Sequence, residues 1–122
     1  MKFYRCKHCG NIIAYVKESG VKVVCCGEPM EELVPNTSDG AHEKHVPVYE
    51  KKDNKVIVNV GAIDHPMVDV HYIEWVALET NKGNQRKALK PNQAPRVEFC
   101  VDKDEQVLAV YAYCNLHGLY KN

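Results

Sequence analysis

The sequence has no excess of charge of either sign, since its 122 residues include 16 Lys or Arg and 16 Asp or Glu. This balance argues against a nucleic-acid partner or an anionic membrane surface, because both attract a basic surplus. No stretch approaches the ~20 consecutive apolar residues of a membrane-spanning helix. The N-terminal MKFYRCKHCG also lacks the apolar region of a secretory signal. We therefore expect a cytoplasmic protein with no nucleic-acid and no membrane partner.

Internal repeats, low-complexity tracts and a helical period of useful length are also missing from the sequence. Apolar residues instead alternate over short segments, as in Val56, Val58 and Val60, and most of the six prolines fall between such segments. This pattern predicts an all-β fold with a sandwich as its main part.

The strands can be assigned in more detail. We expect residues 46–52 and 55–60 to form a hairpin around Asp53-Asn54. A longer strand is expected over residues 72–80, and a last antiparallel pair at 96–101 and 106–114, with Cys100 buried in its strand. Residues 82–90 are interpreted as a loop.

What the sequence does have is six cysteines and six histidines, a dense supply of metal ligands. Four of the cysteines precede residues 35–40, PNTSDG, a run of turn-forming residues that we interpret as a linker. The segment before it is too short to bury a core, because chains below ~40 residues usually need a metal or disulfides to fold. We therefore expect a metal-binding domain at residues 1–36 and a β-sandwich domain at 37–122.

The N-terminal cysteines form a CxxC, Cys6 and Cys9, and an adjacent pair, Cys25 and Cys26. Four thiolates suit a tetrahedral Zn(II) or a single iron. Two disulfides are the alternative, and they are uncommon in a reducing cytoplasm. A zinc ribbon usually closes with a second CxxC, so the missing spacer leaves the identity of the metal open. His8, inside the CxxC, is interpreted as an exposed side chain.

A second set of candidate ligands lies at the margins of the predicted strands: His45, His65, His71, Cys114 and His117. The proline after His65 holds its backbone extended, which helps to aim the imidazole. Four imidazoles and one thiolate suit a six-coordinate metal with one open position, and iron fits this set best. A thiolate donates electron density to iron and shapes how a small oxygen species reacts opposite to it. His42 is interpreted as a surface loop residue.

Three strings in the sequence are similar to the desulfoferrodoxin family, the two-iron form of superoxide reductase: EKHVP at residues 43–47, HPM at 65–67 and CNLHG at 114–118. The N-terminal cysteine pattern resembles the desulforedoxin module, and the resemblance covers essentially the whole chain. It implies a small desulforedoxin-like, rubredoxin-like metal domain followed by an immunoglobulin-like β-sandwich, in a homodimer.

The resemblance also implies a role for each candidate residue. Iron at centre I would be bound by Cys6, Cys9, Cys25 and Cys26. Iron at centre II, alternating between Fe(II) and Fe(III), would have Cys114 as axial ligand and four equatorial ligands, His45, His65, His71 and His117. Glu43 would bind the ferric iron after peroxide has left, and Lys44 would lie near the open position. Residues 68–70 and 82–90 depart from the family pattern but supply no ligand.

The implied reaction is the one-electron reduction of superoxide to hydrogen peroxide, which protects anaerobes from oxidative stress and needs an electron donor such as rubredoxin. Lys44 would steer superoxide and assist protonation of the departing peroxide. Two other functions stay open at this point. One is an electron carrier or zinc-stapled interaction module that uses only the four cysteines. The other is a true superoxide dismutase, which a carboxylate-closed ferric site would obstruct.

Overall fold

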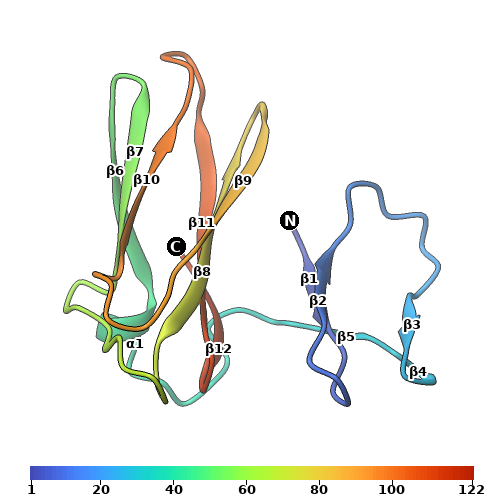
Figure 1. Ribbon diagram of the computed structural model, residues 1–122. Coiled ribbons are helices and arrows are strands. Elements are labelled where there is room, and N and C mark those ends of the chain that lie inside the picture. Colours follow the sequence, from blue (N-terminus) through green and yellow to red (C-terminus); the bar gives the residue numbers. More distant parts are fainter. The chain divides into compact units, whose positions relative to one another are not determined.

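The computed structural model describes residues 1–122, which divide into two compact units, Met1–Val34 and Pro35–Asn122. Twelve strands and one four-residue helix, α1 (His42–His45), make up the regular structure (Figure 1). The predicted all-β class is therefore confirmed. The one helix falls far short of the length needed to cross a membrane.

The second unit is a sandwich of two antiparallel sheets. One sheet has the order β10 (Arg96–Cys100), β7 (Lys55–Val60), β6 (Pro47–Lys52). The other has the order β12 (Gly118–Lys121), β11 (Val107–Cys114), β8 (Ile73–Thr80), β9 (Gly83–Ala88). Strands β6 and β7 form the predicted hairpin, closing at the Lys52–Lys55 pair.

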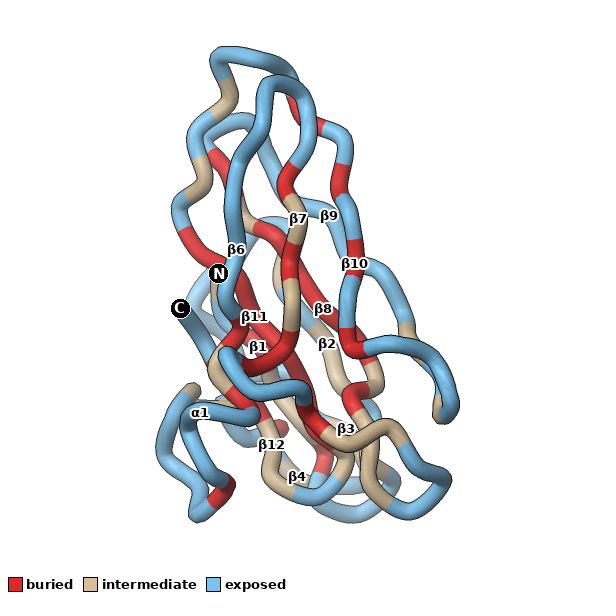
Figure 2. The backbone as a smooth tube through the Cα atoms, turned by 90° about the vertical axis from the view of Figure 1, so that its left-hand side faces the viewer, coloured by how far each residue is buried: buried red, intermediate tan, exposed pale blue.

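Alternate residues of the central strands point into one apolar core. Val58 and Val60 of β7 are fully buried, and they belong to the same cluster as Val76 of β8 and Val110 of β11. Figure 2 shows buried segments in red along β7, β8 and β11. Each such side chain stabilises the fold by about 1.5 kcal/mol or more, so the sandwich is held together by its own core.

The predicted pairing of residues 96–101 with 106–114 is wrong. Strand β10 pairs with β7, whereas β11 pairs with β8 and β12. The chain therefore crosses from one sheet to the other between β10 and β11. The interpretation of residues 82–90 as a loop is also wrong, because they contain β9, which pairs along its whole length with β8. All six residues of β9 are exposed, so it has no buried alternate positions.

Two residues without a predicted role lie differently from expectation. Cys100 is exposed, because Val97 and Phe99 point into the core and the alternation of β10 turns Cys100 outward. The prediction of a buried Cys100 is therefore wrong. His42 begins α1 instead of lying in a loop, and it is exposed as expected.

The first unit has two very small sheets. One has the order β2 (Ile12–Ala14), β1 (Phe3–Arg5), β5 (Glu31–Glu32), and the other pairs β3 (Val24–Cys25) with β4 (Glu28–Pro29). Its only buried apolar side chains are Phe3, Cys6 and Met30. So little burial cannot offset the entropy of ordering the chain, and a cross-link such as a metal must add to it.

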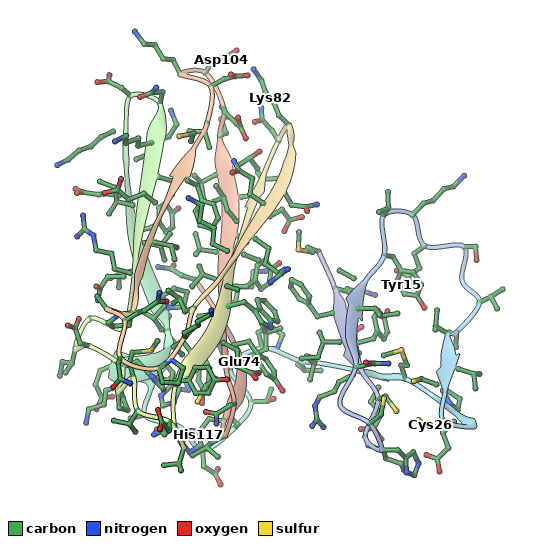
Figure 3. The ribbon with its side chains drawn as sticks, in the orientation of Figure 1. Tyr15, Cys26, Glu74, Lys82, Asp104 and His117 are labelled. Atoms are coloured by element: carbon green, nitrogen blue, oxygen red, sulfur yellow. The ribbon has the colours of Figure 1, made fainter.

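Antiparallel pairing brings four strand ends of the second unit to one end of the sandwich. Pro47, at the start of β6, pairs with Val60, at the end of β7. Likewise Ile73, at the start of β8, pairs with Cys114, at the end of β11. His117 lies at this end of the unit in Figure 3. The four predicted histidine ligands all lie in the chain segments that adjoin these strand ends.

Candidate metal centres

Cys6, Cys9, Cys25 and Cys26 converge in the first unit, where their four sulfurs lie within 4.8 Å of one another. The Sγ atoms of Cys9 and Cys25 are 3.6 Å apart. Four sulfurs arranged tetrahedrally at ~2.3 Å from one ion stand about 3.8 Å apart. The spacing therefore fits a single tetrahedral ion, and no disulfide joins any of the six cysteines.

Two tight turns aim these sulfurs. Gly10, after the CxxC, has a φ of 81°, which glycine adopts easily, and its N–H donates to the Cys6 carbonyl at 2.9 Å. In the turn between β3 and β4, Cys26 and Gly27 both have positive φ, 52° and 79°, as in a type I′ hairpin. Cys25 therefore ends a strand while Cys26 occupies the turn, and the two adjacent thiols can reach one centre.

The backbone of the first turn favours thiolates. The N–H of Cys9 lies 3.5 Å from the Cys6 sulfur, and the N–H of Asn11 lies 3.5 Å from the Cys9 sulfur. The bond from Cys9, with help from the N–H of His8, lowers the pKa of Cys6 to about 6. The pKa of Cys26 rises to about 12 because its thiol bonds to the sulfurs of Cys9 and Cys6. Four thiolates at this range repel one another and are stable together only around a cation.

A group of ion pairs links the two cysteine turns at the surface. Glu28, just after the second turn, contacts Lys7 Nζ at 2.9 Å and His8 Nε2 at 3.2 Å, both from the CxxC. The hydrogen bond with Lys7 is the main cause that lowers the pKa of Glu28, and the hydrogen bond with His8 adds to it. His8 is exposed as predicted, with its ring nitrogen against a carboxylate.

A second cluster forms at the end of the sandwich. His45, His65, His71 and Cys114 each place a ligand atom within 4.8 Å of the others. Nε2 of His45 lies 3.1 Å from Nε2 of His65 and 3.0 Å from Nδ1 of His117. The same nitrogen of His117 lies 3.8 Å from the Cys114 sulfur. The structure thus brings together all five residues of the predicted second centre.

The hydrogen bonds of these rings show which nitrogens are free to bind a metal. Nδ1 of His45 contacts the Ala41 carbonyl at 2.8 Å, and Nδ1 of His65 contacts the Pro66 carbonyl at 2.6 Å. A carbonyl only accepts, so each Nδ1 carries the proton. The two Nε2 atoms then face each other as bare lone pairs, an arrangement that a shared cation stabilises. Nε2 of His71 is likewise buried with no hydrogen-bond partner.

Burial keeps the imidazoles of this cluster neutral. Loss of hydration lowers the pKa of His65 to about 4 and also lowers the pKa values of His45 and His71. The neutral imidazole is the form that binds metals. Burial raises the pKa of the Cys114 thiol, although the backbone N–H of His117 opposes this effect. A metal therefore replaces the Cys114 proton when it binds.

Residues with no role predicted from the sequence fix these rings. The Tyr120 ring lies 4.7 Å from the His45 ring, and its hydroxyl is 2.6 Å from that of Ser38. The Ser38 hydroxyl also donates to the His117 carbonyl. A Cβ at Gly40 would lie 2.3 Å from the Tyr120 hydroxyl and 2.9 Å from the His45 ring, so only glycine fits there. These contacts join residues far apart in the chain, and no local sequence signal reveals them.

Glu43 and Lys44 lie on α1, directly before His45. The N–H of Ile63 donates to the Glu43 carbonyl at 2.9 Å. Gly61, with a φ of 85°, packs so closely that a Cβ there would lie 2.7 Å from the Lys44 Cα. The turn after β7 therefore holds the backbone of both residues, while their side chains are exposed.

Both units match one family of known proteins. A family model described as Desulfoferrodoxin matches residues 37–122, and one described as Desulfoferrodoxin, N-terminal domain, matches residues 1–33. The chain is 48% identical to a desulfoferrodoxin of Nitratidesulfovibrio vulgaris, over 98% of this chain and 94% of that one. It is 44% identical to a desulfoferrodoxin homolog of Archaeoglobus fulgidus, over 100% and 96% of the two chains. Among solved structures, the superoxide reductase of Treponema pallidum aligns with a TM-score of 0.83 at 39% identity, over 99% of this chain and 97% of that one.

The fold and its two donor clusters define a β-sandwich metalloprotein with two separate metal centres. Five donors at the second centre exceed the four of a tetrahedral zinc site, and the mixture of imidazole and thiolate suits iron. The chain belongs to the desulfoferrodoxin family, and its two clusters match the two iron centres of desulfoferrodoxin. The convergence of His45, His65 and His71 excludes the module that would use the four cysteines alone.

Proposed function

We propose that this chain is an oxidoreductase that reduces superoxide to hydrogen peroxide at the histidine–cysteine centre. Membership of the family and the similarity to a solved superoxide reductase support this activity. The observation that carries it is the convergence of the bare Nε2 lone pairs of His45 and His65 beside the buried Cys114. The reaction combines superoxide with one electron and two protons.

An iron ion held at this centre would supply the electron. We assign five residues as its ligands: His45, His65, His71, His117 and Cys114. The carbonyls of Ala41 and Pro66 turn two of the rings so that Nε2 faces the centre, whereas His117 presents Nδ1. The neutral rings add no charge and the thiolate adds a single negative charge. A divalent cation at the centre therefore keeps a net positive charge, which attracts an anion.

Lys44 and Glu43 are the residues to which we assign the handling of substrate and product. The Lys44 ammonium attracts superoxide and holds a water molecule that delivers a proton to the departing peroxide. The Glu43 carboxylate would be the group that closes an oxidised iron centre after the product has left. Because Gly61 and Ile63 hold the backbone of this pair, the two side chains can exchange places by rotation about their own bonds.

We also propose a homodimer in the cytoplasm that receives electrons from a donor such as rubredoxin. A reducing compartment keeps all six thiols available, consistent with the absence of any disulfide. Cys9 and Cys26 are exposed, which leaves the cysteine centre accessible to a redox partner. Val16 and Val21 are strongly exposed on the same unit and suit an interface with a second copy.

The substitution Lys44→Ala tests this function. We expect the second-order rate constant with superoxide, measured by pulse radiolysis, to fall by about tenfold or more at low ionic strength. The bound iron and its absorption spectrum should not change. The matched control is Lys103→Ala, which removes the same charge from an exposed turn before β11. Equal slowing in both variants, or none in Lys44→Ala, would contradict the local role of Lys44.

The substitution Glu43→Ala tests the closing of the oxidised centre. We expect a changed absorption spectrum of the oxidised protein and little change in the first encounter with superoxide. A measurement of oxygen separates reduction from dismutation, because only dismutation releases oxygen from superoxide. Stoichiometric oxygen release by the wild-type protein would contradict the proposed function.

A further inference from the structure

Asn115 directly follows Cys114, and its polar groups bond to the segment that carries His71. The side-chain oxygen of Asn115 accepts from the N–H of Tyr72 at 2.9 Å, and its side-chain nitrogen donates to the Val70 carbonyl at 3.1 Å. Its backbone N–H also donates to the Tyr72 carbonyl at 3.1 Å. Three hydrogen bonds therefore connect one residue to both chain neighbours of His71.

His71 needs such support more than His45 and His65 do. The His45 and His65 rings are each held by a hydrogen bond from Nδ1 to a backbone carbonyl. No protein hydrogen bond of this kind holds the His71 ring, and its Nε2 is buried without a partner. The backbone of His71 pairs only with Val68, in an isolated bridge outside the sheets. The place of the His71 ring therefore depends on how its chain segment is fixed.

The regular strand pairing does not fix this segment. Between β8 and β11, Tyr113 pairs with Trp75, but Cys114 pairs with Ile73, so the register shifts at the point where the ligands begin. β8 starts only at Ile73, after His71. The bonds of Asn115 continue the connection between the two strands beyond this irregularity.

We propose that Asn115 is a positioning residue, which holds His71 at the distance from Cys114 that a shared metal requires. Asn115 touches neither the substrate nor the reacting atoms. It links Cys114, at the end of β11, to His71, in the segment before β8, and the carboxamide suits this task because it both donates and accepts. The inference rests on the iron ligands assigned under the proposed function.

The test compares iron release from the two centres of the holoprotein. Asn115→Ala removes both side-chain bonds and leaves the backbone bond in place. We expect a chelator to remove iron from the histidine–cysteine centre about tenfold faster than in wild type. The absorption band of that centre after oxidation should also shift. The cysteine centre of the same molecule is an internal reference, and its release rate and spectrum should not change.

Two further variants keep the inference falsifiable. Asn115→Asp keeps the acceptor for Tyr72 and loses the donor to Val70, so its release rate should lie between those of wild type and Asn115→Ala. Asn81→Ala is the control, because Asn81 accepts from the N–H of Gln106 at 2.9 Å, where β8 has ended and β11 has not yet begun. It should release iron at the wild-type rate.

The outcomes separate this inference from the proposed function. Wild-type release rates and spectra in Asn115→Ala would overturn the positioning role, and so would equal acceleration in Asn81→Ala. If Asn115→Ala does not fold, the rate of Asn115→Asp decides, and a wild-type rate there overturns the role. Failure of the wild-type protein to reduce superoxide would remove the proposed function, while faster iron release from Asn115→Ala would still support the positioning role.

Discussion

The cysteine centre takes its donors from two tight turns within residues 6–26, whereas the histidine–cysteine centre takes its donors from connections spread over residues 45–117. Two of the four cysteines at the first centre are exposed, but His45, His65 and Cys114 at the second are buried. The first is a local arrangement of neighbouring residues. The second exists only once the strands of the sandwich have paired.

The two units also differ in what stabilises their folds. The second unit has a core of twelve buried side chains, and the ten that are Val, Ile, Leu or Phe can each stabilise the fold by about 1.5 kcal/mol or more when fully buried. The first unit buries three apolar side chains, whereas a structural metal in a small domain contributes ~10–16 kcal/mol. In the first unit the metal stabilises the fold, and in the second the fold assembles the metal site.

The substitution Cys25→Ser should have the largest effect of the variants that test this difference between the two units. We expect the iron content to fall from two atoms per chain to one, because a hydroxyl does not replace a thiolate ligand. Backbone amides of residues 1–34 should then lose their protection from hydrogen exchange, while those of 35–122 keep theirs. Reduction of superoxide with a chemical electron donor should continue at the second centre.

The control for this experiment is Cys100→Ser. Cys100 is an exposed cysteine outside both clusters, so its replacement should change neither the iron content nor the exchange pattern. Retained protection throughout residues 1–34 of Cys25→Ser would show that the first unit folds without its metal. That result would remove the distinction between the two units.

The pH dependence of the metal-free protein tests how strongly burial in the second unit affects its stability. Burial lowers the pKa of His65 from 6.5 to about 4. Between these two pKa values the unfolded chain binds a proton at His65 that the folded chain does not bind. The contribution of His65 to the free energy of unfolding is therefore complete above pH 6.5 and decreases as the pH falls toward 4. By pH 5 the loss from His65 alone is about 2 kcal/mol. Urea unfolding at pH 7 and pH 5, followed by the fluorescence of Trp75, measures it.

The variant His65→Gln isolates this contribution, because glutamine does not titrate. Its free energy of unfolding should change less between pH 7 and pH 5 than that of the metal-free wild type. Iron-loaded protein should change at least as much, because its folded state holds no proton on His65 or Cys114 whereas the unfolded chain takes up both. An equal pH dependence in wild type and His65→Gln would show that the burial of His65 does not affect stability.

The strand pattern of the second unit shows what the sequence can and cannot predict. The alternation of Val56, Val58 and Val60 identifies the inward face of β7, and the Asp53-Asn54 turn predicts the hairpin with β6 correctly. Alternation indicates which residues point inward, but it does not indicate to which of the two facing sheets a strand belongs. The short connection of residues 101–106 therefore looks like a hairpin, although it joins strands of different sheets.

The two other errors have related causes. Strand β9 has no inward face, so its polar sequence looks like that of a loop. The prediction of a buried Cys100 rests on the apolar character of its side chain, although Cys100 shares a face with Arg96 and Glu98, which the alternation turns outward. Position in the period predicts burial better here than the chemical nature of the side chain.

The residues of the candidate sites also divide into those that the sequence can predict and those that it cannot. The thiols and imidazoles that converge at the two centres could be predicted, because such groups at turns and strand margins are chemically distinctive. Gly40, Tyr120 and Asn115 could not, because each acts through a contact with a residue distant in sequence. Their chemistry is ordinary, and only the folded chain shows what they hold.

The smallest predicted effect concerns the ion pairs at the cysteine centre. Glu28→Gln keeps the shape of the side chain but removes the charge that contacts Lys7 and His8, both on the opposite cysteine turn. Exposed ion pairs stabilise little, so a chelator should remove iron from the cysteine centre only about twofold faster. The control Glu32→Gln breaks an ion pair with Lys2 that joins no cysteine turn, and it should have no effect. An acceleration of tenfold or more in Glu28→Gln would mean that surface charges, in addition to the metal, hold the two turns together. The contrast between a unit stabilised by its metal and one stabilised by its core would then be weaker.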